Sequence, residues 1–142
     1  MGKKRVTTLS GIEEKTIVPE KGVKKKVSLP VARIYINAKW NNTFVTLTDD
    51  QGNVYEIIST GQVGFKGTKK STPYAGSRVV EVLYEKLKNY SIEKIKVFVS
   101  GFGPGRDSAL KMLFSKDLPI YLIEDITPVP FGGPRPPKVR RV

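Results

Sequence analysis

The chain has 142 residues, enough for one small domain with its own core, and it carries a net charge of +12 with a pI near 9.9. It contains neither cysteine nor histidine, which excludes thiolate catalysis, histidine acid–base catalysis, disulfides and nearly all zinc sites. No apolar run approaches the roughly 18 residues of a membrane span, and none follows the basic N-terminus, so we expect no membrane segment and no signal peptide.

The positive charge is concentrated at the two ends of the chain. Residues 1–30 hold eight basic and three acidic side chains, whereas residues 31–131 hold thirteen basic and ten acidic ones. Residues 132–142 hold four basic side chains and no acidic one. Basic arms on a nearly neutral centre are typical of nucleic-acid anchors, so the pattern indicates a polyanionic partner.

The predicted elements follow one another with clear punctuation. Residues 1–30 lack periodicity and are expected to form an extended or disordered basic arm. Alternation of apolar and polar residues predicts strands at 31–40, 43–48 and 54–60, and a glycine- and lysine-rich loop at 61–72 precedes a helix at 73–89. A strand at 92–100, a glycine turn at 101–105, a helix at 106–116 and a strand at 119–127 complete the series.

This order, βββαβαβ, predicts an α/β domain over residues 31–127. We expect a three-layer mixed five-stranded β-sheet with two main helices, in which the last βαβ unit is parallel and right-handed. Residues 128–142 contain proline, glycine and basic residues and are expected to form an extended tail. Within the domain, Tyr35 and Phe98 are expected to lie in the core.

The loop Gly61–Thr72 and its exit to Tyr74 give the strongest local signal. The loop has three glycines and three lysines without an acid, and Thr72-Pro73 starts a helix whose free N–H groups attract anions. Glycines permit close approach of a phosphate backbone, and Phe65 or Tyr74 offers a stacking surface for a base. The alternative is an ordinary solvated loop.

The segment GFGPGR, residues 101–106, lies between a strand and a helix and resembles a phosphate-binding turn. Arg106 at the helix start would neutralise the phosphate charge. A tight structural turn is the alternative, and the spacing does not match a dinucleotide fingerprint. The segment Trp40–Thr43 is read as a hairpin tip in which Trp40 either caps the core or presents its ring.

Taken together, four linked motifs resemble one known family. They are NNTxVTxTDxxGN (41–53), GxxGFKGxKKSTPYA (61–75), GxGPGR (101–106) and DxTPxPxxGxRPPKxRRV (125–142). In this order and spacing they are similar to the universal small-subunit ribosomal protein eleven family, in its bacterial or organellar form. One departure is Phe131-Gly132-Gly133-Pro134, where the family commonly has His-Asn-Gly-Cys, so an isoaspartate cannot form at that position.

The resemblance implies a ribonuclease-H-like fold without nuclease activity and a place on the platform of the small subunit, near the mRNA exit path. It implies small-subunit (16S-type) rRNA and neighbouring platform proteins as partners, possible contact with mRNA, no homo-oligomer, and a cytoplasmic or organellar ribosome as location. No catalytic residue, cofactor or metal is expected. The implied RNA-binding residues are Asn41, Asn42, Gly64, Phe65, Lys66, Gly67, Lys69, Lys70, Ser71, Thr72, Pro73, Gly103, Pro104, Gly105, Arg106, Arg135, Lys138, Arg140 and Arg141.

Two alternatives stay open at the level of sequence. A metal-dependent nuclease on the same fold would need carboxylates from separate strands to converge on one point. The available acids are Asp49, Asp50, Asp107, Glu124 and Asp125. The second alternative is a regulator that binds mRNA.

Overall fold

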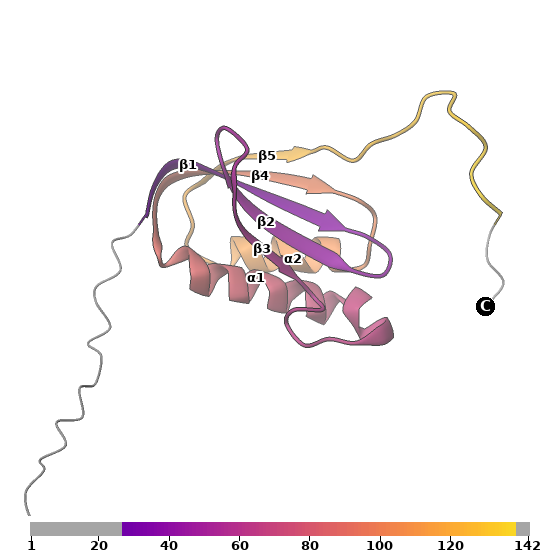
Figure 1. Ribbon diagram of the computed structural model, residues 1–142, viewed down its shortest axis with the longest axis horizontal. Coiled ribbons are helices and arrows are strands. Elements are labelled where there is room, and N and C mark those ends of the chain that lie inside the picture. The colour runs from indigo at the N-terminus through magenta and orange to yellow at the C-terminus, as the bar shows by residue number, and fades with distance from the viewer. Residues whose placement is uncertain (1–26, 139–142) are drawn as a thin grey trace, which may run out of the picture.

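The computed structural model describes residues 27–138 (Figure 1). The predicted N-terminal arm therefore lies outside the described residues up to position 26, as do Arg140 and Arg141 of the tail. Neither helix in the described range is long and apolar enough to cross a membrane.

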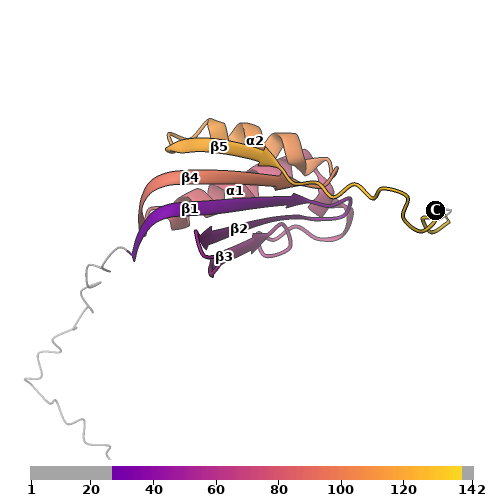
Figure 2. The same cartoon turned by 90° about the horizontal axis from the view of Figure 1, so that it is seen from above.

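Five strands form one mixed sheet in the order β3-β2-β1-β4-β5 (Figure 2). Their bounds are β1 Val27–Ala38, β2 Thr43–Asp49, β3 Val54–Ser59, β4 Tyr90–Ser100 and β5 Ile120–Asp125. β1–β2 and β2–β3 pair antiparallel, whereas β1–β4 and β4–β5 pair parallel. The predicted meander and the predicted parallel βαβ unit are both present.

Two helices and a short 3-10 helix connect the strands. η1 spans Gly67–Ser71, α1 spans Pro73–Leu87 and α2 spans Gly105–Phe114. Thr72 caps α1 because its side-chain oxygen accepts the N–H of Ala75 at 3.3 Å, and Pro73 occupies the first turn, where its missing N–H costs nothing.

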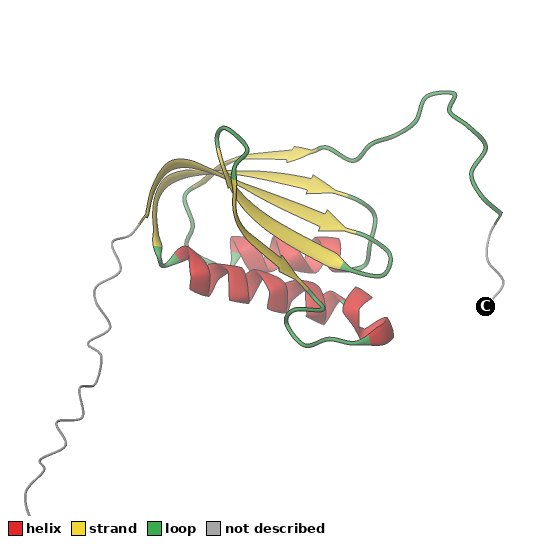
Figure 3. Ribbon diagram, in the orientation of Figure 1, coloured by secondary structure: helices red, strands yellow, loops and turns green. Residues whose placement is uncertain are grey.

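The predicted fold class, a mixed five-stranded sheet with two main helices, is confirmed. The predicted number of layers, three, is wrong. Both helices lie on the same face of the sheet, so the described domain has two layers and not three (Figure 3). The connections β3–α1–β4 and β4–α2–β5 each join parallel strands and cross the sheet in the same direction. Right-handed crossovers in one direction place their helices on one face.

The core fills the space between the helices and this face of the sheet. Its largest fully buried side chains come from β1, β2, α1, β4 and α2, and include Ile34, Leu47, Leu83, Ile95 and Leu113. The opposite face carries Tyr35 and Phe98, whose rings stack with centroids 5.0 Å apart, so the expectation that they belong to the core is wrong.

Candidate nucleic-acid interface

Every RNA-binding segment predicted within the described residues begins at the same end of the sheet. β1, β3, β4 and β5 all end there, because β2 is the one antiparallel strand in the sheet. The β1–β2 tip, the loop before α1, the β4–α2 turn and the root of the tail therefore meet at that end, and both helices start there (Figures 1 and 2). The N-terminal ends of two helix dipoles thus point toward an approaching anion.

Hydrogen bonds join the β1–β2 tip to its neighbours. The Thr60 hydroxyl donates to the side-chain oxygen of Asn42, and the Thr60 N–H donates to the Thr43 carbonyl at 3.2 Å. On the other side, the Gly103 N–H donates to the Ala38 carbonyl at 2.9 Å. Asn42 therefore has a structural role as a link to the loop, while its neighbour Asn41 is exposed.

The loop between β3 and α1 presents its charge to solvent. Lys66 and Lys69 are exposed, whereas Lys70, Ser71 and Thr72 are half-buried. Gly64 and Gly67 have positive φ angles of 103° and 56°, and a Cβ at either would meet nothing within 4 Å. The loop thus leaves open space above two glycines beside exposed lysines, an arrangement that admits a phosphate backbone.

The glycines of the β4–α2 turn serve close packing. Gly103 and Gly105 are buried, and a Cβ on Gly103 would lie 2.2 Å from the Lys39 carbonyl oxygen. A Cβ on Gly105 would lie 2.4 Å from Thr43 Oγ1. Of the residues predicted here to contact RNA, Pro104 alone is exposed, so the glycine requirement has a packing explanation.

Arg106 is occupied by its own chain. Its Nη1 donates to the Gly101 carbonyl at 2.8 Å and to Thr127 Oγ1 at 3.2 Å, while Nη2 lies 2.6 Å from Asp125 Oδ2. Hydrogen bonds from Thr127 and then from Arg106 lower the pKa of Asp125 to about 2. The guanidinium therefore connects the turn to the end of β5.

The tail leaves the domain directly after this contact. Pro128–Lys138 are exposed, including Arg135 and Lys138. In Figure 1 the tail continues from β5 away from the sheet. Its two described basic residues are therefore available to a partner.

Three exposed aromatic side chains lie at this end, and of these sequence reasoning missed Phe102 entirely. Trp40, Tyr74 and Phe102 are 72%, 66% and 67% exposed, and they lie on the hairpin tip, the start of α1 and the β4–α2 turn. The interpretation that Trp40 caps the core is wrong. For Phe102 a signal existed, because a side chain between two closely packed glycines has little room inside.

Asp125 and Thr127 were also missed as structural partners of Arg106. Asp125 Oδ1 accepts the Thr127 N–H at 2.9 Å and the Thr127 hydroxyl at 2.6 Å. An Asp followed two residues later by Thr is a recognised side-chain-to-backbone turn, so Asp125-Ile126-Thr127 carried a local signal.

The carboxylates of the nuclease alternative do not converge. Asp49 and Asp50 lie at the β2–β3 turn, and Glu124 and Asp125 at the end of β5. The register separates the two pairs by four residues along the strands, about 13 Å, and by three strand spacings of about 4.8 Å each. Within residues 27–138 no three Cys, His, Asp or Glu side chains gather in a way that would hold a metal.

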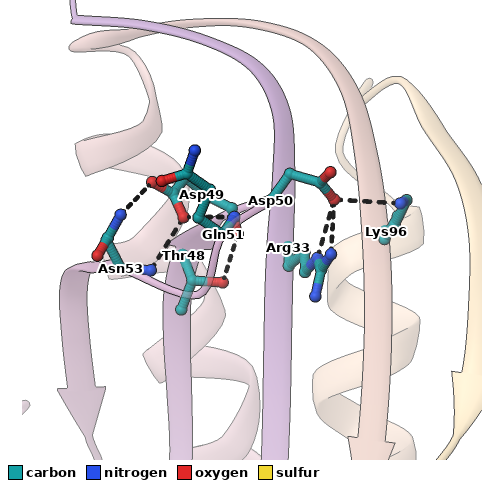
Figure 4. A network of polar contacts seen from close by, with 7 residues as sticks. All are labelled: Arg33, Thr48, Asp49, Asp50, Gln51, Asn53 and Lys96. Carbon is teal, nitrogen blue, oxygen red and sulfur yellow. Dashed lines mark hydrogen bonds and ion pairs between the residues drawn. The ribbon is translucent and has the colours of Figure 1, made fainter.

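The two acids of the β2–β3 turn are engaged in local contacts (Figure 4). Asp49 accepts hydrogen bonds from the Asn53 side chain and from the backbone of the turn, which lower its pKa. Asp50 accepts from Arg33 at 2.7 Å and from Lys96 at 3.2 Å, and these contacts lower its pKa. Both carboxylates are therefore occupied by contacts within the domain.

Comparison with known proteins gives a consistent result. A family model described as ribosomal protein S11 matches residues 32–141. The small ribosomal subunit protein uS11 of Endomicrobium trichonymphae is 46% identical over 119 residues, which cover 84% of this chain and 91% of that protein. The protein of the same name from a Nitratiruptor species is 47% identical over 126 residues, covering 86% of this chain and 97% of that protein.

Proposed function

The chain belongs to the ribosomal protein S11 family, structural and non-enzymatic components of the small ribosomal subunit, and we propose that it binds 16S-type rRNA through the end of the sheet described above. We place this contact in the platform region, near the mRNA exit path. The neighbouring platform proteins are its protein partners, and it acts as a single copy in cytoplasmic or organellar ribosomes.

The convergence of separate segments on one end of the domain carries this proposal. The loop before α1, the hairpin tip and the tail lie far apart in the sequence, yet they emerge together beside two helix N-termini. A single RNA surface is then within reach of exposed lysines, exposed aromatic rings and a basic tail. The lysines and the basic tail hold phosphates, and unpaired bases stack on the aromatic rings.

Within the proposed interface the segments have different tasks. Lys66 and Lys69, together with Arg135 and Lys138, neutralise phosphates, because all four are exposed. Asn42, Gly103, Gly105 and Arg106 shape the surface from below.

The test is a filter-binding titration of the full chain against a transcript of bacterial 16S rRNA, with excess tRNA as competitor. One variant carries Lys66→Ala and Lys69→Ala, on the loop. Its matched control carries Lys88→Ala and Lys94→Ala, two exposed lysines at the opposite end of α1 and β4. Both variants lose two positive charges.

We expect the loop variant to bind about tenfold more weakly and to lower the slope of log affinity against log salt by about 1.5, since each lost phosphate contact removes about 0.7–0.9. The control should change affinity less than about twofold. Equal weakening by the two variants would mean that net charge and not the proposed surface governs binding, and the proposal would be rejected.

A further inference from the structure

Three side chains connect the root of the tail to the domain. Arg106 at the start of α2 contacts both Asp125 at the end of β5 and Thr127, the last residue before the proline-rich tail. We refer to Arg106, Asp125 and Thr127 as the latch.

Hydrogen bonds from several elements hold the latch residues in place. The Thr127 hydroxyl donates to Asp125 Oδ1 at 2.6 Å, and its oxygen accepts the Gly101 N–H at 3.2 Å and Arg106 Nη1 at 3.2 Å. The backbone adds a further bond, from the Ile126 N–H to the Val99 carbonyl at 2.9 Å. Thr127 is therefore held by the β4–α2 turn and by α2, and its neighbour Ile126 is held by β4, although β5 itself ends at Asp125.

Within the described residues, the hydrogen bonds between this segment and the domain end at Thr127, and the prolines that follow stiffen the chain. Residues Pro128–Lys138 are exposed, and Pro128 and Pro130 follow the latch directly. Proline fixes φ near −65° and favours extended backbone, so a direction set at Thr127 persists over several residues. It persists as far as Gly132, where φ is +63° and the chain can turn.

We propose that the latch fixes the direction in which residues 128–131 leave the domain, and so limits the region in which the basic residues of the tail, beginning with Arg135, can meet the RNA. This inference rests on the proposed function, because it concerns how the tail contributes to rRNA binding. Arg106, Asp125 and Thr127 are then positioning residues, which act on the RNA through the tail.

The physical reason is the cost of ordering. A tail that rotates freely about its root loses that freedom when it binds, whereas a tail fixed at its root has lost it on folding. The latch raises the effective concentration of the tail's basic residues at their phosphates without adding a contact to RNA. Opening it should therefore weaken binding without changing the number of phosphates contacted.

The experiment is a double-mutant cycle in the full chain. Thr127→Val removes the hydroxyl and keeps the branched shape, and Thr127→Ser serves as the conservative variant that retains the hydroxyl. The second change neutralises the tail with Arg135→Ala, Lys138→Ala, Arg140→Ala and Arg141→Ala. Affinity for a bacterial 16S rRNA transcript is measured across a salt series, together with thermal unfolding and the ¹⁵N relaxation of residues 128–131.

In the intact tail we expect Thr127→Val to weaken binding about fivefold with an unchanged salt slope, and Thr127→Ser to bind like the wild type. In the neutralised tail Thr127→Val should have less than about a twofold effect. Relaxation should report faster motion of residues 128–131 in the free Thr127→Val protein.

Two results would overturn the latch. One is the same loss of affinity in both backgrounds, which would mean that Thr127 acts through the domain. The other is no loss in the intact chain while relaxation shows the tail released. A neutralised tail that binds as tightly as the wild type would instead reject the role of the tail in the proposed function, while the loop variant still tests the rest of the interface.

Discussion

Two explanations can account for the glycine at position 103 in the β4–α2 turn, and one substitution distinguishes them. If the glycine exists so that a phosphate can approach, Gly103→Ala should weaken RNA binding and leave the fold intact. If it exists because the β4–α2 turn packs against the β1–β2 hairpin, the same change should destabilise the domain. The structure favours the second explanation, since the added Cβ would lie 2.2 Å from the Lys39 carbonyl oxygen and 2.7 Å from its carbon.

The size of the effect follows from this geometry. An ordinary contact requires about 3.4 Å or more, so the hairpin or the turn must move by about 1 Å, and overpacking of this kind costs about 1–3 kcal/mol. The movement also strains the 2.9 Å bond from the Gly103 N–H to the Ala38 carbonyl, which contributes about 1 kcal/mol. We expect a loss of about 3 kcal/mol in the free energy of unfolding, which lowers Tm by about 12 °C for a domain of this size.

Urea titration and thermal unfolding followed by circular dichroism measure this loss. Gly61→Ala is the matched control, because its added Cβ would find its nearest neighbours at 3.8 and 3.9 Å. The control should unfold within about 1 kcal/mol of the wild type. A Gly103→Ala protein that is as stable as the control but binds 16S rRNA weakly would refute the packing explanation.

Three further predictions concern the folded domain. Thr72→Ala removes the oxygen that accepts the Ala75 N–H and should cost about 1 kcal/mol in urea titrations, whereas Thr72→Ser should cost less. Gly76→Ala brings a Cβ within 2.6 Å of the Gly105 carbonyl oxygen, so overpacking should exceed the roughly 1 kcal/mol gain in helix propensity and Tm should fall; a rise in Tm would contradict the close contact of α1 and α2. Because the pKa of Asp125 is lowered from 3.8 to about 2, its stabilising effect is complete above pH 4 and is lost as the pH falls toward 2; the stability difference between wild type and Asp125→Asn should shrink over that range in denaturant titrations and stay constant from pH 5 to 7.

Local signals predicted which elements form, because they act within a few residues. The cap at Thr72 and the clean alternation of residues 43–48 led to a helix and a strand that the structure contains. Strand ends were less predictable. β1 begins at Val27 and not at 31, because Val27 pairs with Tyr90 of β4, a contact between residues far apart in the sequence.

The buried side of the short helix α2 was predicted only in part. The spacing of apolar residues in the helix at 106–116 predicts Leu110, Leu113 and Phe114 on its buried side. Leu113 of α2 is buried, but Phe114 is 54% exposed. Ala109 lies in the core in its place. The buried stripe of a short helix depends on which neighbour it meets, and α2 packs chiefly against α1, a contact that hydrophobic spacing cannot reveal.

Some features of the candidate interface were predictable from local sequence and others were not. Exposed lysines in an acid-free loop were found from composition alone, and the structure places Lys66 and Lys69 in solvent. The contacts of Arg106 were not predictable from local sequence. Its partners Asp125 and Thr127 lie 19 and 21 residues further along the chain, after α2 and at or beyond the end of β5. A basic residue at a helix start has the same local sequence whether it faces a phosphate or a carboxylate.

In the proposed interface, the placement of positive charge matters more than its total amount. Within residues 27–138, the salt bridges join basic and acidic side chains on or beside the sheet and helices: Arg33 and Lys96 with Asp50, Arg78 with Glu81, Lys86 with Glu56, and Arg106 with Asp125. These pairs cancel locally and contribute little to the electrostatic field around the domain. The lysines of the loop take part in none of the salt bridges of the described chain, and Arg135 and Lys138 stand on an exposed tail. A field focused at one end predicts unequal effects for two variants of equal charge, and the comparison of the loop lysines with Lys88 and Lys94 measures that inequality.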